Sequence, residues 1–178
     1  MKLLRRVSFF ILGLMVLVAI VGLFLPDRAN LSRTVSINAP AAKIFPKINS
    51  LKNFNDWSPW YERDPNTEYR YEGPEAGVGC KVSWHSEHPQ VGTGSQEILE
   101  SVPDQWVKTH LDFGAQGQAT AYFELTEKGA TTEVTWGFDT LFGYDILGRY
   151  FGLMLEGMLA PDYEAGLSKL KQIVEEES

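Results

Sequence analysis

The sequence has 178 residues, a single cysteine and a net charge of −7, with 44% hydrophobic and 22% charged residues. This length suits one globular domain, and this composition excludes a chain that is disordered throughout. Because Cys80 is alone, the chain holds no internal disulfide and no cysteine-rich metal site. The acidic balance argues against a nucleic-acid-binding protein, which normally presents a basic face to phosphate.

The beginning of the chain contains a long uncharged run from Val7 to Leu25. A helix of this length spans ~28 Å, close to the ~30 Å hydrocarbon core of a bilayer. We therefore expect residues 1–26 to form a transmembrane anchor, residues 27–32 a short linker and residues 33–178 a folded domain.

A cleaved signal peptide is the alternative for this run. Its apolar region usually has ~7–15 residues and ends at a small-x-small cleavage site. The run here is longer, and Ala19, Gly22 and Ala29 have no small residue two positions upstream. These features favour an uncleaved anchor.

The basic residues around the run predict its orientation. Lys2, Arg5 and Arg6 precede it, against Arg28 and Arg33 after it, so the N-terminus should stay in the cytoplasm and the domain should be periplasmic or extracellular. The residues after position 26 carry a net charge of −10. Anionic headgroups should repel such a domain, so the apolar run would hold it at the membrane.

After the linker, the pattern predicts one strand, two short helices and six more strands. The first strand is Arg33–Asn38, and the helical regions follow at residues 39–48, where Pro46 should bend or break the helix, and 51–57. Alternation of apolar and polar residues then indicates six consecutive strands: Thr67–Glu72, Gly79–Ser86, Thr93–Glu100, Trp106–Phe113, Ala119–Leu125 and Thr131–Phe138.

From about Tyr144 the apolar residues recur at helical spacing. They are Ile146, Leu147, Tyr150, Phe151, Met154, Leu155 and Met158, then Tyr163, Leu167, Leu170 and Val174. Pro161 separates the two sets, so we expect a kink or break near Ala160. The whole pattern predicts an α+β fold in which a seven-stranded antiparallel curved sheet wraps its apolar face around a long C-terminal helix. Incomplete closure would leave a cavity lined with aromatic side chains.

This order of elements resembles the START-like SRPBCC superfamily, and within it the membrane-anchored bacterial branch of the polyketide cyclase/dehydrase and lipid transport family. The residues that carry the resemblance are Val35–Pro40, Ile44–Phe45, Trp57–Trp60, Asp64–Pro65, Gly77–Gly79, Trp84, Val134–Trp136 and Ala160–Lys171. The resemblance covers residues 33–174 and implies the helix-grip fold. It implies no single function, because the superfamily includes lipid carriers, cyclases and hydrolase-like members.

Aromatic and apolar residues on the inferred inward faces are the candidate lining of the cavity. They are Trp57, Trp60, Tyr69, Tyr71, Trp84, Leu111, Phe123, Trp136, Phe138, Tyr150, Met154 and Met158. Ordinary core packing is the alternative for each of them. For Trp57 and Trp60 the choice is between a wall at the cavity mouth and a hydrophobic clasp that fixes the short helices on the sheet.

The sequence offers no convincing catalytic or metal-binding group. His85 and His88 lie three apart on an extended segment and would point to opposite faces, and His110 is the only other histidine. Cys80 alternates with Lys81 and so falls on the apolar face, where a thiol behaves as a small hydrophobe. We expect no catalytic residue, no metal and no cofactor.

These observations predict a membrane-anchored module that binds or transfers a hydrophobic small molecule, such as a lipid or an isoprenoid. Burying ~300 Å² of ligand hydrocarbon yields ~7 kcal/mol before the costs of association, and it requires no catalysis. One alternative is a cyclase, dehydratase or hydrolase that uses a titratable group in the cavity, such as His110 or Asp139. The other is a non-catalytic interaction module of the cell envelope with an exposed apolar patch. Nucleic acid is not an expected partner, and the oligomeric state stays open.

Overall fold

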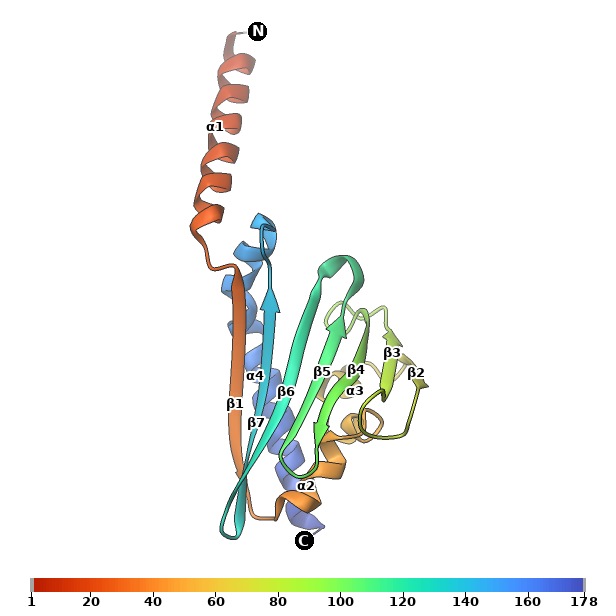
Figure 1. The fold of residues 1–178 in the computed structure, drawn as a ribbon. Coiled ribbons are helices and arrows are strands. Elements are labelled where there is room, and N and C mark those ends of the chain that lie inside the picture. The colour runs from red at the N-terminus through yellow and green to blue at the C-terminus, as the bar shows by residue number, and fades with distance from the viewer. Residues whose placement is uncertain (1, 178) are drawn as a thin grey trace.

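The structure is a computed structural model that describes residues 2–177, in which an apolar N-terminal helix stands beside one end of an α+β domain (Figure 1). The helices are α1 (Lys2–Phe24), α2 (Ala41–Ile48), α3 (Pro59–Arg63) and α4 (Ile146–Glu176), with short 3₁₀ turns η1 (Asn53–Asp56) and η2 (Gly114–Gln116). The strands are β1 (Arg28–Ile37), β2 (Glu68–Glu72), β3 (Lys81–His85), β4 (Thr93–Val102), β5 (Trp106–Asp112), β6 (Gln118–Lys128) and β7 (Thr131–Leu141).

The seven strands form one antiparallel sheet in the order β1-β7-β6-β5-β4-β3-β2. Strands β2 to β7 therefore each pair with their neighbours in sequence, and β1 lies at the edge of the sheet beside β7. The buried residues of β6 alternate as the strand period requires, at Ala119, Ala121, Phe123 and Leu125. The predicted α+β fold, with a curved seven-stranded sheet, a long C-terminal helix and an apolar N-terminal helix, is confirmed.

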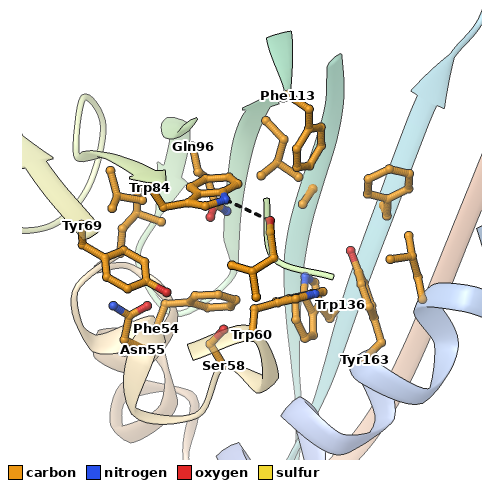
Figure 2. Close-up of a pocket in the computed structure, with 17 residues that line it drawn as sticks. Phe54, Asn55, Ser58, Trp60, Tyr69, Trp84, Gln96, Phe113, Trp136 and Tyr163 are labelled. Atoms are coloured by element: carbon orange, nitrogen blue, oxygen red, sulfur yellow. Dashed lines mark hydrogen bonds between the residues drawn. The ribbon is translucent and has the colours of Figure 1, made fainter. Parts of the chain in front are cut away.

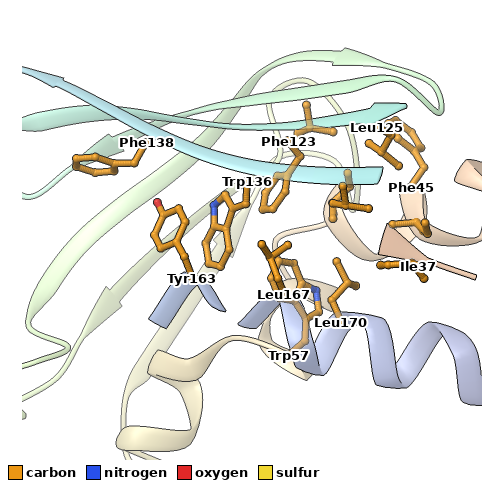
Figure 3. Close-up of a cluster of buried hydrophobic side chains, with 14 of the residues drawn as sticks. Ile37, Phe45, Trp57, Phe123, Leu125, Trp136, Phe138, Tyr163, Leu167 and Leu170 are labelled. Carbon is orange, nitrogen blue, oxygen red and sulfur yellow. The ribbon is translucent and has the colours of Figure 1, made fainter. Parts of the chain in front are cut away.

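The core lies between the sheet and the second half of α4. Tyr163, Leu167, Leu170 and Val174 follow the three- and four-residue spacing of one helix face, and all are buried. Figure 3 shows Leu167 and Leu170 directed from α4 toward the apolar face of the sheet. Each layer thus covers the single apolar surface that the other cannot bury alone.

Trp136, in the middle of β7, joins four segments of the chain through its ring. Its centroid lies 3.9 Å from the ring of Tyr163 on α4, 5.4 Å from Phe123 on β6, 5.4 Å from Trp57, 5.7 Å from Phe54 in η1 and 5.8 Å from Trp60 in α3. Phe123 and Tyr163 stack on it, while the other three rings meet it edge to face. This single side chain therefore connects the sheet, the long helix and the short helices (Figure 3).

Helix α2 continues through Pro46, where a bend or break was expected. Ile44, Phe45 and Ile48 are buried, whereas Pro46 faces solvent. The Ala41 N–H, which has no partner within the helix, donates a hydrogen bond to the Glu127 carboxylate at 2.8 Å. The packed apolar stripe and this capping contact stabilise a helix of only eight residues despite its proline.

Two further expectations differ from the structure. Helix α4 is not broken at Pro161, where a break was one of the two expected outcomes. Pro161 and Gly157, whose carbonyl loses its helical partner, both lie on the exposed side, where water can bond that carbonyl. Residues 28–32, which were expected to be a linker, form the first half of β1, because Leu31 is buried and pairs with Phe138 of β7.

The bulge in β4 explains an irregular stretch of sequence. The register with β5 shifts between Ile98 and Glu100, so that Ile98 is fully buried and Leu99 next to it is exposed. A β-bulge adds one residue to one strand and interrupts the alternation of faces. Two adjacent apolar residues can therefore occur in a strand that is otherwise half-buried.

Helix α1 is attached to the domain at its C-terminal end by Arg149 of α4. The guanidinium, buried at 9% exposure, donates from Nη1 to the carbonyl oxygens of Leu23 at 2.8 Å and Leu25 at 3.1 Å, and from Nε to that of Gly143 at 2.8 Å. The carbonyls at a helix C-terminus carry partial negative charge and lack helical partners, so a cation is favourable there. A Cβ on Gly22 would lie 2.3 Å from Ile146, which shows how closely the two helices approach.

Two glycines of α4 provide a matched test of the packing around Trp136. A Cβ at Gly166 would lie 2.9 Å from the Trp136 ring, which five other rings hold in place, whereas a Cβ at Gly157 meets nothing within 4 Å. We expect Gly166→Ala to lower the free energy of unfolding by ~1–3 kcal/mol through overpacking. Gly157→Ala should raise it by ~0.5–1 kcal/mol, because alanine is the better helix former. Urea denaturation of the two variants measures both, and equal shifts would contradict the packing described here.

Candidate ligand-binding pocket

A pocket of about 130 Å³ lies on the apolar face of the sheet. Strands β3 to β7 form one side of it, and the segment from Leu51 to Trp60 and helix α4 form the other. Its lining is mostly aromatic and aliphatic, and in Figure 2 the side chains from these elements surround a common space. The lining residues are Leu51, Phe54, Asn55, Ser58, Trp60, Tyr69, Val82, Trp84, Val91, Gln96, Leu111, Phe113, Ala121, Trp136, Phe138, Leu159 and Tyr163.

The pocket reaches toward the α1 end of the sheet. Phe113 follows the last residue of β5, Ala121 is the fourth residue of β6, and Phe138 is close to the end of β7. In Figure 1 the β5–β6 and β7–α4 connections both lie at the end of the sheet nearest α1. The opposite end, where α2 packs, belongs to the solid core.

The two tryptophans of the Trp57-Ser58-Pro59-Trp60 segment have different surroundings. Trp57 is fully buried outside the pocket, and its indole donates to the carbonyl oxygen of Lys47 in the last turn of α2 at 3.2 Å. Trp60 lines the pocket and packs edge to face on Trp136 and Tyr163. The clasp and the pocket wall are therefore formed by different residues of the same short segment.

A few polar groups interrupt the apolar lining. The Gln96 amide is buried and donates from Nε2 to Thr109 Oγ1 at 2.9 Å. The Trp84 indole donates to the carbonyl oxygen of Val91 at 3.3 Å, and the Asn55 amide donates to Tyr71 Oη at 2.7 Å. These contacts hold the polar side chains in fixed orientations, which is how a mostly apolar site orients the polar atoms of a ligand.

The two tyrosines of the lining are neutral hydrogen-bonding groups. Burial raises the pKa of Tyr69, and burial raises the pKa of Tyr163 still more strongly. No aspartate, glutamate, histidine, lysine, arginine or cysteine is among the residues found to line the pocket in the described part of the chain. The lining therefore supplies hydrogen-bond donors and acceptors, and the Ser58 hydroxyl in it has no histidine, lysine or carboxylate beside it among these lining residues that could activate it.

Half of the residues expected to line a cavity do so: Trp60, Tyr69, Trp84, Leu111, Trp136 and Phe138. The others lie elsewhere. Trp57 and Phe123 belong to the solid core, and Tyr71 stacks on the outer side of Tyr69. Tyr150 contacts α1, donating from Oη to the carbonyl oxygen of Val18 at 2.8 Å, whereas Met154 and Met158 are exposed on α4.

Some lining residues were not among those expected. Phe113 shares the alternating face of Leu111, and Tyr163 and Leu159 lie near the apolar stripe of α4, so a signal for them was present in the sequence. Gln96 gave no such signal. It is a polar residue in the irregular strand β4, where the bulge obscures which face each residue occupies.

The other groups considered for chemistry lie outside the pocket. No group of three metal-binding side chains occurs among residues 2–177. Cys80 is buried at 3% exposure, and Asp139 faces Arg28 at 3.7 Å between Nε and Oδ1. His110 lies on β5 without reaching the pocket.

Helix α3 is fixed to α4 beside the pocket by two ion pairs. Arg63 donates to both carboxylate oxygens of Asp162, with 2.9 Å between Nη1 and Oδ2, and Asp162 is buried at 8% exposure. Lys169 of α4 pairs with Glu62, the residue before Arg63 in α3. Because Trp60 and Tyr163 are neighbours of these pairs in sequence, the pairs position one wall of the pocket.

A comparison of two acidic residues on α4 tests this clamp. Asp162→Ala leaves the Arg63 guanidinium without its partner, so we expect a loss of ~1.5–3 kcal/mol in the free energy of unfolding. Glu164→Ala removes an exposed partner of Arg33 and should cost less than ~1 kcal/mol. Chemical denaturation of both variants measures the difference, and a larger loss for Glu164→Ala would be inconsistent with a buried clamp.

A family model described as "Polyketide cyclase / dehydrase and lipid transport" matches residues 28–175. No curated protein sequence matches the chain.

Solved structures share the fold at low sequence identity. A protein from Mesorhizobium loti is 16% identical, with a TM-score of 0.57 over 84% of this chain and 98% of that one. A protein from Staphylococcus epidermidis is 12% identical, with a TM-score of 0.59 over 87% and 95%. The di-domain ARO/CYC StfQ from the steffimycin biosynthetic pathway is 11% identical, with a TM-score of 0.61 over 84% of this chain and 51% of StfQ.

Proposed function

The chain belongs to the polyketide cyclase / dehydrase and lipid transport family, and we propose that it is a membrane-anchored module that binds a hydrophobic small molecule, such as a lipid or isoprenoid, in the pocket between sheet and helix. The observation that carries the proposal is the lining itself. It is predominantly apolar and aromatic, with a few fixed neutral polar groups, as is typical of sites for apolar ligands.

The size of the pocket limits what enters it. A dry cavity of ~150 Å³ accommodates a molecule the size of benzene. At about 130 Å³, the pocket holds one ring or a short hydrocarbon segment of a ligand, and the remainder extends out of the pocket or displaces its walls. Each 100 Å² of hydrocarbon removed from water contributes ~2.5 kcal/mol before the costs of association.

Binding is favoured over catalysis by the chemistry of the lining. Acid–base or nucleophilic catalysis needs a titratable group near the reacting atoms. His110 and Asp139, the candidates for an enzyme, lie away from the pocket, and the pKa values of Tyr69 and Tyr163 are raised rather than lowered. The ARO/CYC description belongs to StfQ, whose likeness to this chain concerns the fold.

The anchor in this proposal is α1. Residues Leu4–Phe24 form a helix of 21 residues that is long and apolar enough to cross a membrane. A signal sequence shares those features, but cleavage after this run would remove carbonyl partners of Arg149 at Leu23 and Leu25. It would also leave β1 close to a new chain end, next to the Asp27 carbonyl oxygen that accepts a hydrogen bond from the Phe142 N–H at 2.7 Å. These contacts support an uncleaved helix. The excess of basic residues before the helix supports a cytoplasmic N-terminus and a periplasmic or extracellular domain.

Filling the pocket tests the proposed binding. Ala121 is buried in the floor of the pocket, so Ala121→Phe should occupy the space a ligand would use. We expect full-length wild-type protein, released from its host membrane in mild detergent, to retain an apolar ligand in native mass spectrometry, and Ala121→Phe to lose it. Ala165→Phe places the same side chain at an exposed position of α4 and should retain the ligand. An empty wild-type protein, or equal retention by both variants, would refute binding in this pocket.

The anchor is tested by the mass and extraction of the protein. We expect the intact mass of the membrane-derived protein to include residues 4–24, and the protein to stay in the membrane fraction after alkaline carbonate washing. Protease added to intact cells, or to cells whose outer barrier has been opened, should digest the domain. A mass that lacks α1 would identify a cleaved signal peptide instead.

A further inference from the structure

The first half of α4 has an apolar face that no part of the described chain covers. Leu147, Phe151, Met154 and Met158 are 78%, 44%, 57% and 54% exposed. Their spacing of four, three and four residues places them within an arc of ~60° on one side of the helix. Single exposed apolar residues need no explanation, but a stripe along three turns indicates a contact surface.

This stripe begins beside the end of α1. Ile146 packs against Gly22, and the Tyr150 hydroxyl donates to the carbonyl oxygen of Val18 at 2.8 Å. Val18 lies six residues, or ~9 Å of helix, before Phe24. In a chain whose α1 crosses a bilayer, the first turns of α4 therefore lie at the depth where the hydrocarbon core meets the headgroups.

The charged residues within the length of the stripe do not belong to it. Between residues 144 and 158 they are Asp145, Arg149 and Glu156, of which Arg149 and Glu156 lie on the opposite side of the helix, and Glu156 pairs with Arg33 at 3.2 Å. The Asp145 carboxylate accepts a hydrogen bond from the Gly148 N–H at 3.0 Å at the start of α4, and Arg149 is buried against carbonyl oxygens of α1. Tyr144, 92% exposed just before α4, is of the residue type enriched at membrane interfaces.

The stripe also leads to the pocket. Met158, its last residue, is followed directly by Leu159, which lines the pocket. Phe113 and Phe138 line the pocket from the end of the sheet nearest α1. The stripe therefore extends along α4 from the end of α1 to the turn of α4 that borders the proposed ligand site.

We propose that Tyr144, Leu147, Phe151, Met154 and Met158 form a membrane face that rests in the interfacial layer of the lipid bilayer. The proposal rests on the anchor of the proposed function, and it adds that the domain is held against the membrane in one orientation. Arg149 fixes α1 to α4, so the span and the stripe meet the bilayer as one unit. An apolar ligand would then pass between the lipid and the pocket along α4 with little exposure to water.

Lipid is the occupant that these observations favour. The face is continuous with the C-terminal part of a helix that carries no charge from Val7 to Phe24, and any partner at this depth must itself be compatible with lipid. The domain carries a net charge of −10 after residue 26, so its attraction to the membrane is apolar rather than electrostatic. Contact should therefore be similar with zwitterionic and anionic lipids and insensitive to salt.

The test uses the full-length chain in phosphatidylcholine vesicles, with and without phosphatidylglycerol. In a Cys80→Ala background, single cysteines at Leu147 or Met154 carry an environment-sensitive fluorophore, and the vesicles contain nitroxide-labelled phosphatidylcholine. Val78→Cys is the matched control, because Val78 is 60% exposed but lies near the end of the sheet where α2 packs. Val16→Cys, in α1, reports on the anchor.

We expect the nitroxide to quench most of the fluorescence at Leu147, Met154 and Val16, and little at Val78, in both kinds of vesicle and at high salt. Quenching at Val16 alone would overturn the membrane face while leaving the anchor intact. No quenching at Val16 would overturn the anchor, and the membrane face with it. Disulfide-linked dimers of unlabelled Met154→Cys, with no quenching at this position, would show that a second copy covers the face and would also overturn the proposal.

Discussion

The contact between Trp136 and the five rings around it determines the arrangement of the rest of the domain. Edge-to-face and offset aromatic pairs contribute ~0.5–1.5 kcal/mol each beyond the area that they bury. More important here is their geometry, because the Tyr163 ring, 3.9 Å from Trp136, sets how closely α4 approaches the sheet. Gly166, with no side chain, permits that approach from the same helix. A large, rigid ring in the centre of the sheet thus separates two regions of different character.

On one side of Trp136 the interior is solid, and on the other it is open. Trp57, Phe123 and Leu167 fill the space toward α2, where Ile37 and Ile44 are fully buried. Toward α1, the layers are separated by Trp60 and Tyr163, and the pocket begins there. Trp136 and Tyr163 form the boundary that both regions share, and the remaining residues of each region differ. A substitution in the pocket, such as one at Ala121, is expected to affect binding more than it affects the solid half of the core.

Helix α4 serves both regions because it is longer than the core requires. Its 31 residues extend ~46 Å, and its buried apolar residues are concentrated after Pro161. The preceding half is attached to α1 through Ile146, Arg149 and Tyr150, and to the domain through Leu155 in the core and the Glu156–Arg33 ion pair. The side of this half that carries Leu147, Phe151, Met154 and Met158 remains exposed beside α1, which is why we propose a membrane as its partner.

The sequence predicted the fold better than the site, for physical reasons. Strand alternation and helical spacing are local, and they were sufficient for the sheet, the long helix and the apolar span. They do not fix which side of a long helix meets the sheet at each turn, so spacing alone places Met154 and Met158 in the cavity although both lie on the exposed side of α4. Nor does spacing distinguish Trp57 from Trp60, since the turn between η1 and α3 decides which indole enters the core. The start of β1 depends on a tertiary contact, because Leu31 pairs with β7. The continuity of α4 depends on the exposure of Pro161 to solvent.

The small volume of the pocket and its extension toward the α1 end of the sheet together constrain the kind of ligand. A compact soluble molecule would have to pay for dehydration of its polar groups in a lining that offers little more than Gln96, Asn55 and two neutral tyrosines. A ligand with one ring or chain segment in the pocket and the rest along α4 avoids that cost, because its exposed portion meets the apolar stripe instead of water. In this proposed arrangement the ligand needs no large cavity. Where lipid itself forms the outer boundary of the site, the protein has to enclose only the portion of the ligand that it recognises.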